Sequence, residues 1–238
     1  MMLFVNKNSV LLLSLWLAAF CAIADSPFTA GPWEQVRERD GITVYQREVP
    51  GWGIKEVRAT GNVAASMQDL LEFISDVKYY SKINEIVSVA GVVQQNDPEK
   101  DYYFIVLDIP WPTTDRSAIY SRQVSVDKEK QRITISDKAD SELDITPAME
   151  DTVRIVRSMQ EWKLQKMDDC TTKVSLTSLT DPSSPIPAFL INSMSVDAPM
   201  QSIANLQKLL RIPAKLSAHP VDGDRCAHTL NAGAVVLL

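Results

Sequence analysis

Residues 186–211 read IPAFLINSMSVDAPMQSIANLQKLLR, and their apolar side chains recur three or four positions apart. This period is typical of an amphipathic helix that packs one face against a core. Pro187 suits a first helical turn, whereas Pro199 lies inside the stretch and removes a backbone hydrogen bond there. The pattern therefore predicts one long helix, kinked or broken at Pro199.

The region before this helix, from Glu85 to Asp181, is rich in β-branched and aromatic residues. It divides into runs that predict strands at 85–95, 101–109, 117–127, 131–137, 152–166 and 171–180. Asn, Asp and Pro mark the separators, at spacings typical of hairpins and a meander. We therefore expect neighbouring strands to pair antiparallel.

The N-terminal part of the domain predicts a hairpin followed by short helices. After an extended or helical lead around 33–37, Gly41 opens a strand that ends at the Pro50-Gly51 turn, and 54–63 forms its partner. Ser66 is expected to cap a helix with apolar residues at helical spacing, and a second short helix follows over 76–81.

The first 24 residues have the features of a secretory signal peptide. Lys7 precedes an apolar stretch from Val10 to Ile23, and Ala22-Ile23-Ala24 ends in small residues. A helix of that length spans about 21 Å of a roughly 30 Å hydrocarbon core, which argues against a permanent anchor. We expect cleavage after Ala24 and export to the periplasm or beyond, leaving one domain over 25–213. For the tail, 214–238, disorder and edge packing both stay open.

Charge and histidine content narrow the function classes. The formal net charge is −6, and loss of Lys7 with the signal makes it more negative, so nucleic acid and anionic membrane surfaces are disfavoured partners. Both histidines, His219 and His228, fall in the tail, so the domain lacks the usual general base, metal ligand or triad member. No phosphate-binding glycine loop occurs. We expect neither a metal nor a cofactor.

Cysteine usage points to at most one disulfide in the exported chain. Only Cys170 and Cys226 follow the signal, too few to build a scaffold, although export would permit a bridge between them. The sequence leaves that bridge open.

Several short stretches resemble START domains of the Bet v1-like, helix-grip superfamily. In family order they are Trp33 with Asp40–Tyr45, then Asp108–Arg116, Glu161–Leu164, and Asp181-Pro182 with Ile186–Asn192. Together they cover Trp33 to Leu210, nearly the whole domain. The resemblance implies an α+β helix-grip fold, in which a curved antiparallel sheet wraps a long C-terminal helix. It also implies a hydrophobic tunnel that holds one sterol, phospholipid or similar lipid.

Candidate lipid-binding residues follow from this arrangement. The expected lining of the final helix consists of Phe189, Leu190, Met194, Met200 and Ile203, with ordinary core packing as the alternative. Arg116 could pair with a carboxylate such as Asp108, either to orient a ligand head or simply to hold the Pro-Trp-Pro turn. Tyr120 completes the polar set. Arg58 and Arg157 are expected to face solvent, and Trp162 to belong to the core.

Three functional hypotheses remain open at this stage. The favoured one is a non-catalytic domain that binds and carries one lipid or other hydrophobic molecule, with Pro199 as a hinge for its release. The second is a cyclase- or aromatase-like enzyme on the same fold, using Asp108, Arg116 and Tyr120. The third is a solidly packed interaction module. We expect a monomer and no nucleic acid, and leave transient membrane contact open.

Overall fold

The computed structural model describes residues 30–93, 101–144, 146–183, 186, 191 and 193–210. Several predictions lie outside these residues: the signal peptide, the tail with both histidines and Cys226, and the lining candidates Phe189 and Leu190. The side chain of Met194 lies outside them as well.

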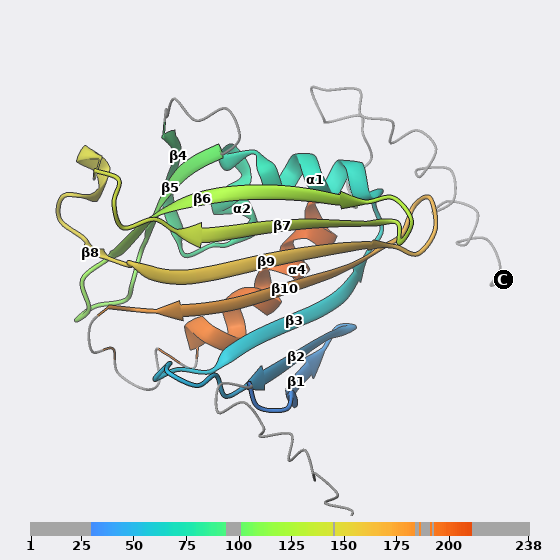
Figure 1. Ribbon diagram of the computed structural model, residues 1–238, viewed down its shortest axis with the longest axis horizontal. Coiled ribbons are helices and arrows are strands. Elements are labelled where there is room, and N and C mark those ends of the chain that lie inside the picture. Colours follow the sequence, from blue (N-terminus) through green and yellow to red (C-terminus); the bar gives the residue numbers. More distant parts are fainter. Residues whose placement is uncertain are drawn as a thin grey trace, which may run out of the picture.

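The described strands form one sheet of ten, shown in Figure 1. The order across it is β1-β2-β3-β10-β9-β7-β6-β5-β4, and β8 pairs with β6 off this path. The bounds are β1 (Glu34–Arg39), β2 (Ile42–Arg47), β3 (Glu56–Val63), β4 (Val87–Val93), β5 (Asp101–Leu107), β6 (Arg116–Asp127), β7 (Arg132–Ala139), β8 (Val153–Arg154), β9 (Arg157–Lys166) and β10 (Thr172–Asp181). The α+β helix-grip prediction is confirmed.

One predicted strand is wrong, because 152–166 is divided into β8 and β9. Val153 donates to Asp115 O at 2.9 Å and Ile155 to Ser117 O at 2.7 Å, so this short segment runs parallel to β6. The chain then turns, and β9 pairs antiparallel with β7 and β10. Propensity alone hides the break, because β-branched residues continue through it.

The two helical segments predicted after β3 lie where the sequence places them. Ser66 caps α1 (Met67–Ser75) by accepting a hydrogen bond from the Asp69 amide at 3.1 Å. Two single turns, η1 (Val77–Tyr79) and α2 (Tyr80–Ile83), follow it, and η2 (Pro147–Met149) lies between β7 and β8. No helix among the described residues is long and apolar enough to cross a membrane.

The C-terminal helix is less regular than predicted. The α-helical part, α4, covers Ala198–Leu210, and a π-helical turn, η3, covers Ser193–Asp197 immediately before it. Pro199 is the second residue of α4, so the expected irregularity takes the form of a π turn at its N-terminal side.

Of the three apolar clusters among the described residues, two lie beside the site, and the third joins Val106 and Ile119 to Met149. The larger cluster joins α1, α2 and α4 to β2, β3, β7, β9 and β10, and α4 passes behind β3, β9 and β10 in Figure 1. The approach is close at Gly61 of β3, where a Cβ atom would lie 3.1 Å from Ile203 Cγ2. The smaller cluster joins β4, β5 and β6, and includes Tyr103, Tyr120 and Ile155. These clusters lie on either side of the site.

Candidate ligand-binding cavity

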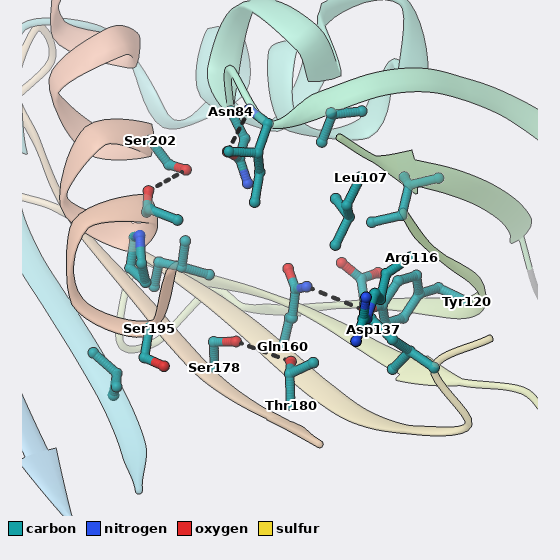
Figure 2. Close-up of a pocket in the computed structure, with 18 of the residues that line it drawn as sticks. Asn84, Leu107, Arg116, Tyr120, Asp137, Gln160, Ser178, Thr180, Ser195 and Ser202 are labelled. Carbon is teal, nitrogen blue, oxygen red and sulfur yellow. Dashed lines mark hydrogen bonds between the residues drawn. The ribbon is translucent and has the colours of Figure 1, made fainter. Parts of the chain in front are cut away.

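A cavity of about 170 Å³ separates the two clusters, and Figure 2 shows part of its lining. Val57, Ile74 and Trp162 of the larger cluster lie on its wall, as do Ile105 and Tyr120 of the smaller one. Cavities of roughly 150 Å³ with apolar walls accept a molecule such as benzene. The interior is therefore hollow enough for a hydrophobic group.

The helix contributes small side chains to this cavity. Ser195, Ala198, Pro199 and Ser202 lie on the lining, at helical spacing. The hydroxyl of Ser202 donates to Ala198 O at 2.9 Å, so it places no unpaired donor in the cavity. Small residues on this face leave the space that larger ones would fill.

Met200 and Ile203, which we expected on the lining, lie instead in the larger core cluster. They are 4% and 0% exposed, and neither is on the cavity wall. The reason is that large apolar side chains gain most where they pack closely against the sheet. The alternative of core packing holds for both residues.

A polar row crosses the sheet on the cavity side. The register places Arg122 of β6 opposite Asp137 of β7, Asp137 opposite Gln160 of β9, and Gln160 opposite Ser178 of β10. All four residues line the cavity. Alternation along each strand therefore directs four polar side chains from four adjacent strands into one interior space.

Arg122 and Asp137 form a buried ion pair within this polar row. Arg122 Nε donates to Asp137 Oδ1 at 2.7 Å and Nη2 to Oδ2 at 2.8 Å, and their side chains are 4% and 1% exposed. Arg122 Nη1 also donates to Ile74 O at 2.9 Å. Burial alone would lower the pKa of Arg122, but the hydrogen bonds and charge of Asp137 raise it above the ordinary value. Arg122 thus keeps its charge, with Asp137 as its partner.

Three tyrosines surround the ion pair. The rings of Tyr103 and Tyr120 stack at 5.3 Å, Tyr80 meets Tyr103 edge-on at 5.2 Å, and the Arg122 guanidinium lies 4.7 Å from the Tyr103 ring centroid. Burial raises the pKa of all three phenols, that of Tyr120 to about 12. At neutral pH they are protonated, so they act as hydrogen-bond partners and not as bases.

A hydroxyl network continues from Tyr120 toward β10. Tyr120 OH donates to Ser158 Oγ at 3.0 Å and accepts from Gln160 Nε2 at 3.3 Å. Ser158 Oγ lies 2.7 Å from Thr180 Oγ1, which lies 3.4 Å from Ser178 Oγ. Neutral donors and acceptors therefore extend the polar wall beyond the ion pair.

Among the predicted polar residues, Arg116 and Tyr120 line the cavity and Asp108 does not. Asp108 is exposed, because strand alternation turns it away from the inward-facing Leu107. The prediction that Arg116 pairs with Asp108 is wrong. Arg116 Nη1 donates to Thr114 O. The carboxylate that holds this turn belongs to Asp115, which accepts a hydrogen bond from the Ile109 amide at 3.0 Å. Whether these residues bind lipid stays a prediction.

The other residues considered from the sequence lie as follows. Arg58 and Arg157 are not on the lining, and their guanidinium groups stack on Trp33 and Trp52 at 4.1 and 3.8 Å. Trp162 belongs to the core, as predicted, but its side chain also borders the cavity. Within the described ranges, no three His, Cys, Asp or Glu side chains lie close enough together to hold a metal ion. Cys170 is disulfide-bonded, and both other cysteines lie outside these ranges.

Sequence reasoning missed Arg122, Asp137 and Gln160. Each lies in a strand that was predicted correctly, and each shares an inward face with apolar neighbours two residues away. That alternation was a usable signal, because a charged residue in phase with buried apolar ones is costly unless it is paired. The partner could be named only once the register was known.

Comparisons with known proteins agree with this architecture. The START domain family model matches residues 26–207. An uncharacterized protein of Pseudomonas aeruginosa is 27% identical over 201 residues, which are 84% of this chain and 96% of that protein. A STAR-related lipid transfer protein from Xanthomonas axonopodis is similar in structure, with a TM-score of 0.66 and 23% identity, covering 75% of this chain and 98% of that one. Human StAR-related lipid transfer protein 5 gives a TM-score of 0.62 and 16% identity, covering 74% and 85%.

Proposed function

The chain belongs to the START domain family, and from this premise we propose that it binds one lipid or other hydrophobic molecule in the cavity without transforming it. The observation that carries the proposal is the cavity of about 170 Å³ between the two apolar clusters. Each methylene moved from water into such a space contributes about 0.8 kcal/mol, offset in part by the costs of association. The names of the Xanthomonas and human structures, which describe lipid transfer, support the same class of ligand.

The chemistry of the polar wall favours binding over catalysis. The Arg122–Asp137 pair is closed on itself, and the three buried phenols stay protonated at neutral pH. A cyclase or aromatase needs a positioned acid or base that exchanges a proton with its substrate. A wall that combines an ion pair closed between its own two side chains with protonated hydroxyl groups is better suited to orienting a ligand.

Native mass spectrometry of the purified protein, with analysis of its organic extract, tests the proposal. We expect one hydrophobic molecule per chain, recovered unchanged. Recovery of a chemically altered form of an added ligand would support a cyclase-like enzyme instead. A protein that carries no ligand and takes up no hydrophobic probe would overturn the proposal in favour of an interaction module.

A matched pair of α4 variants ties uptake to the cavity. Ala198→Leu places a large side chain on the lining and should abolish uptake while the fold persists, because the ligand and the new side chain compete for the same volume. Lys208→Leu introduces the same leucine side chain at an exposed position of the same helix and should leave uptake unchanged. Equal uptake by both variants would place the ligand elsewhere.

A further inference from the structure

Gln160 stands at the centre of the polar wall, and its hydrogen bonds fix which way its amide faces. Tyr120 OH has a single proton, which it donates to Ser158 Oγ at 3.0 Å. It can therefore only accept from Gln160, which donates Nε2 to it at 3.3 Å. The side-chain oxygen of Gln160 must then point the other way, and Figure 2 shows it directed into the open space of the cavity.

Gln160 Oε1 is a hydrogen-bond acceptor that can receive a donor from a ligand. No described residue donates a hydrogen bond to Gln160 Oε1. On the opposite wall, Asn84 Oδ1 accepts a hydrogen bond from the Ile86 amide at 3.4 Å. The Nδ2 group of Asn84 is therefore the one that can donate into the cavity. Gln160 and Asn84 thus give the cavity a neutral acceptor on one wall and a neutral donor on the other, and a hydroxyl group can pair with either of them.

Beside Gln160, the charges on the lining give no matching site for an anion. Arg122 is held in a two-pronged pair by Asp137, and its remaining Nη1 donor serves Ile74 O. Lys55 lies 3.3 Å from Glu48, and Arg116 donates to Thr114 O. A carboxylate or phosphate placed beside Gln160 would face an amide oxygen and the Asp137 carboxylate, both of which repel it.

We propose that the cavity selects neutral amphiphiles that carry a hydroxyl group, which donates to Gln160 Oε1. The inference rests on the proposed function and specifies its ligand class: an alcohol is preferred over an ester of similar length, which cannot donate, and over a carboxylate, which is charged. Gln160 is the residue that determines this preference.

Calorimetric titration of the full chain, freed of bound ligand, with octan-1-ol, methyl octanoate and octanoate tests the preference. One net hydrogen bond to a buried acceptor corresponds to roughly a five- to tenfold difference in affinity, so octan-1-ol should bind tighter than either other probe by about that factor. Equal affinity for the alcohol and the ester, or tightest binding of octanoate, would overturn the proposal. If none of the three probes binds, the proposed function itself fails.

A substitution assigns the effect to the residue. Gln160→Met keeps the length of the side chain but removes its acceptor, and should lower octan-1-ol affinity to that of methyl octanoate while leaving the ester unchanged. Gln165→Met makes the same change on the same strand, at a glutamine outside the cavity that donates to Lys130 O, and should alter neither. A loss that is equal for alcohol and ester in Gln160→Met would contradict the assignment. The comparison of probes on the unsubstituted chain stands even if this variant does not fold.

Discussion

Two neighbouring rows of side chains on the inner face of the sheet lie only two residues apart on each strand, yet they have different surroundings. The apolar row consists of Val124, Ile135, Trp162 and Leu176, and the polar row of Arg122, Asp137, Gln160 and Ser178. Ile135, Trp162 and Leu176 pack into the larger cluster with α4, whereas all four polar residues face the cavity. The apolar row thus mainly supports the helix, although Trp162 and Leu176 also border the cavity, and the polar row forms the hydrogen-bonding part of the cavity wall.

The difference follows from what lies opposite each row. Met200, Ile203 and Leu206 of α4 fill the space in the larger cluster, whereas Ala198, Pro199 and Ser202 face the cavity. Packing on one side of the helix holds it at the sheet, and small residues on the other keep it from closing the void. One face of α4 therefore stabilises the fold, and the other leaves the cavity open.

The largest expected effect comes from breaking the ion pair of the polar row. Asp137→Ala leaves the Arg122 charge buried without its partner, and should lower the free energy of unfolding by about 3–5 kcal/mol. The double variant Arg122→Met/Asp137→Leu removes both charges and should recover most of that loss. Urea unfolding measures both variants. If the free energy of unfolding of Asp137→Ala lay within about 1 kcal/mol of that of the original protein, the ion pair would not contribute to stability.

The apolar row should respond to truncation in a different way. Ile135, which is 0% exposed, should cost about 2–5 kcal/mol on replacement by Ala, because a cavity is left in close-packed surroundings. Ser178→Ala, in the polar row one strand beyond Gln160, removes a hydroxyl that already faces open space and should change unfolding by less than about 1 kcal/mol. Urea unfolding compares Ile135→Ala with Ser178→Ala. An equal loss of stability in both variants would show that the two rows do not differ in how closely they are packed.

The sequence could predict the local elements but not the polar row, for a physical reason. Ser66 as a helix cap, the strand segments other than 152–166, and the helical period over 198–210 are local signals that hold in the described residues. The Arg122–Asp137 pair joins residues fifteen positions apart through a register that no local pattern encodes. Large apolar residues on α4 were expected to line the site because they suit lipid, yet the same property draws them into the core.

Alkaline pH offers a smaller and graded test of the polar wall. Burial raises the pKa of Tyr120 to about 12, above its ordinary value near 10, so the phenol contributes stability that is present below pH 10 and lost as pH rises toward 12. Its share of the loss by pH 11 should be about 1.4 kcal/mol, one pKa unit. Urea unfolding between pH 8 and 11 should show the fall, and Tyr120→Phe should make it shallower. An identical pH profile for that variant would mean that Tyr120 is not protected from ionisation by the fold.

Pro199 gives the smallest expected change in stability and tests whether the wall opposite the polar row moves. Its missing amide leaves the helical hydrogen-bond ladder incomplete where η3 meets α4, beside the cavity. Pro199→Ala restores a backbone hydrogen-bond donor, which stabilises the helix, but raises the conformational entropy of the unfolded chain, which destabilises the fold. The two effects on the free energy of unfolding should cancel to within about 1 kcal/mol. If the incomplete ladder lets the helix flex, the variant should release a bound fluorescent alcohol several-fold more slowly in stopped-flow displacement, whereas Pro50→Ala, in an exposed turn, should not. Unchanged release from Pro199→Ala would mean that ligand leaves by a route that does not require this helix to bend.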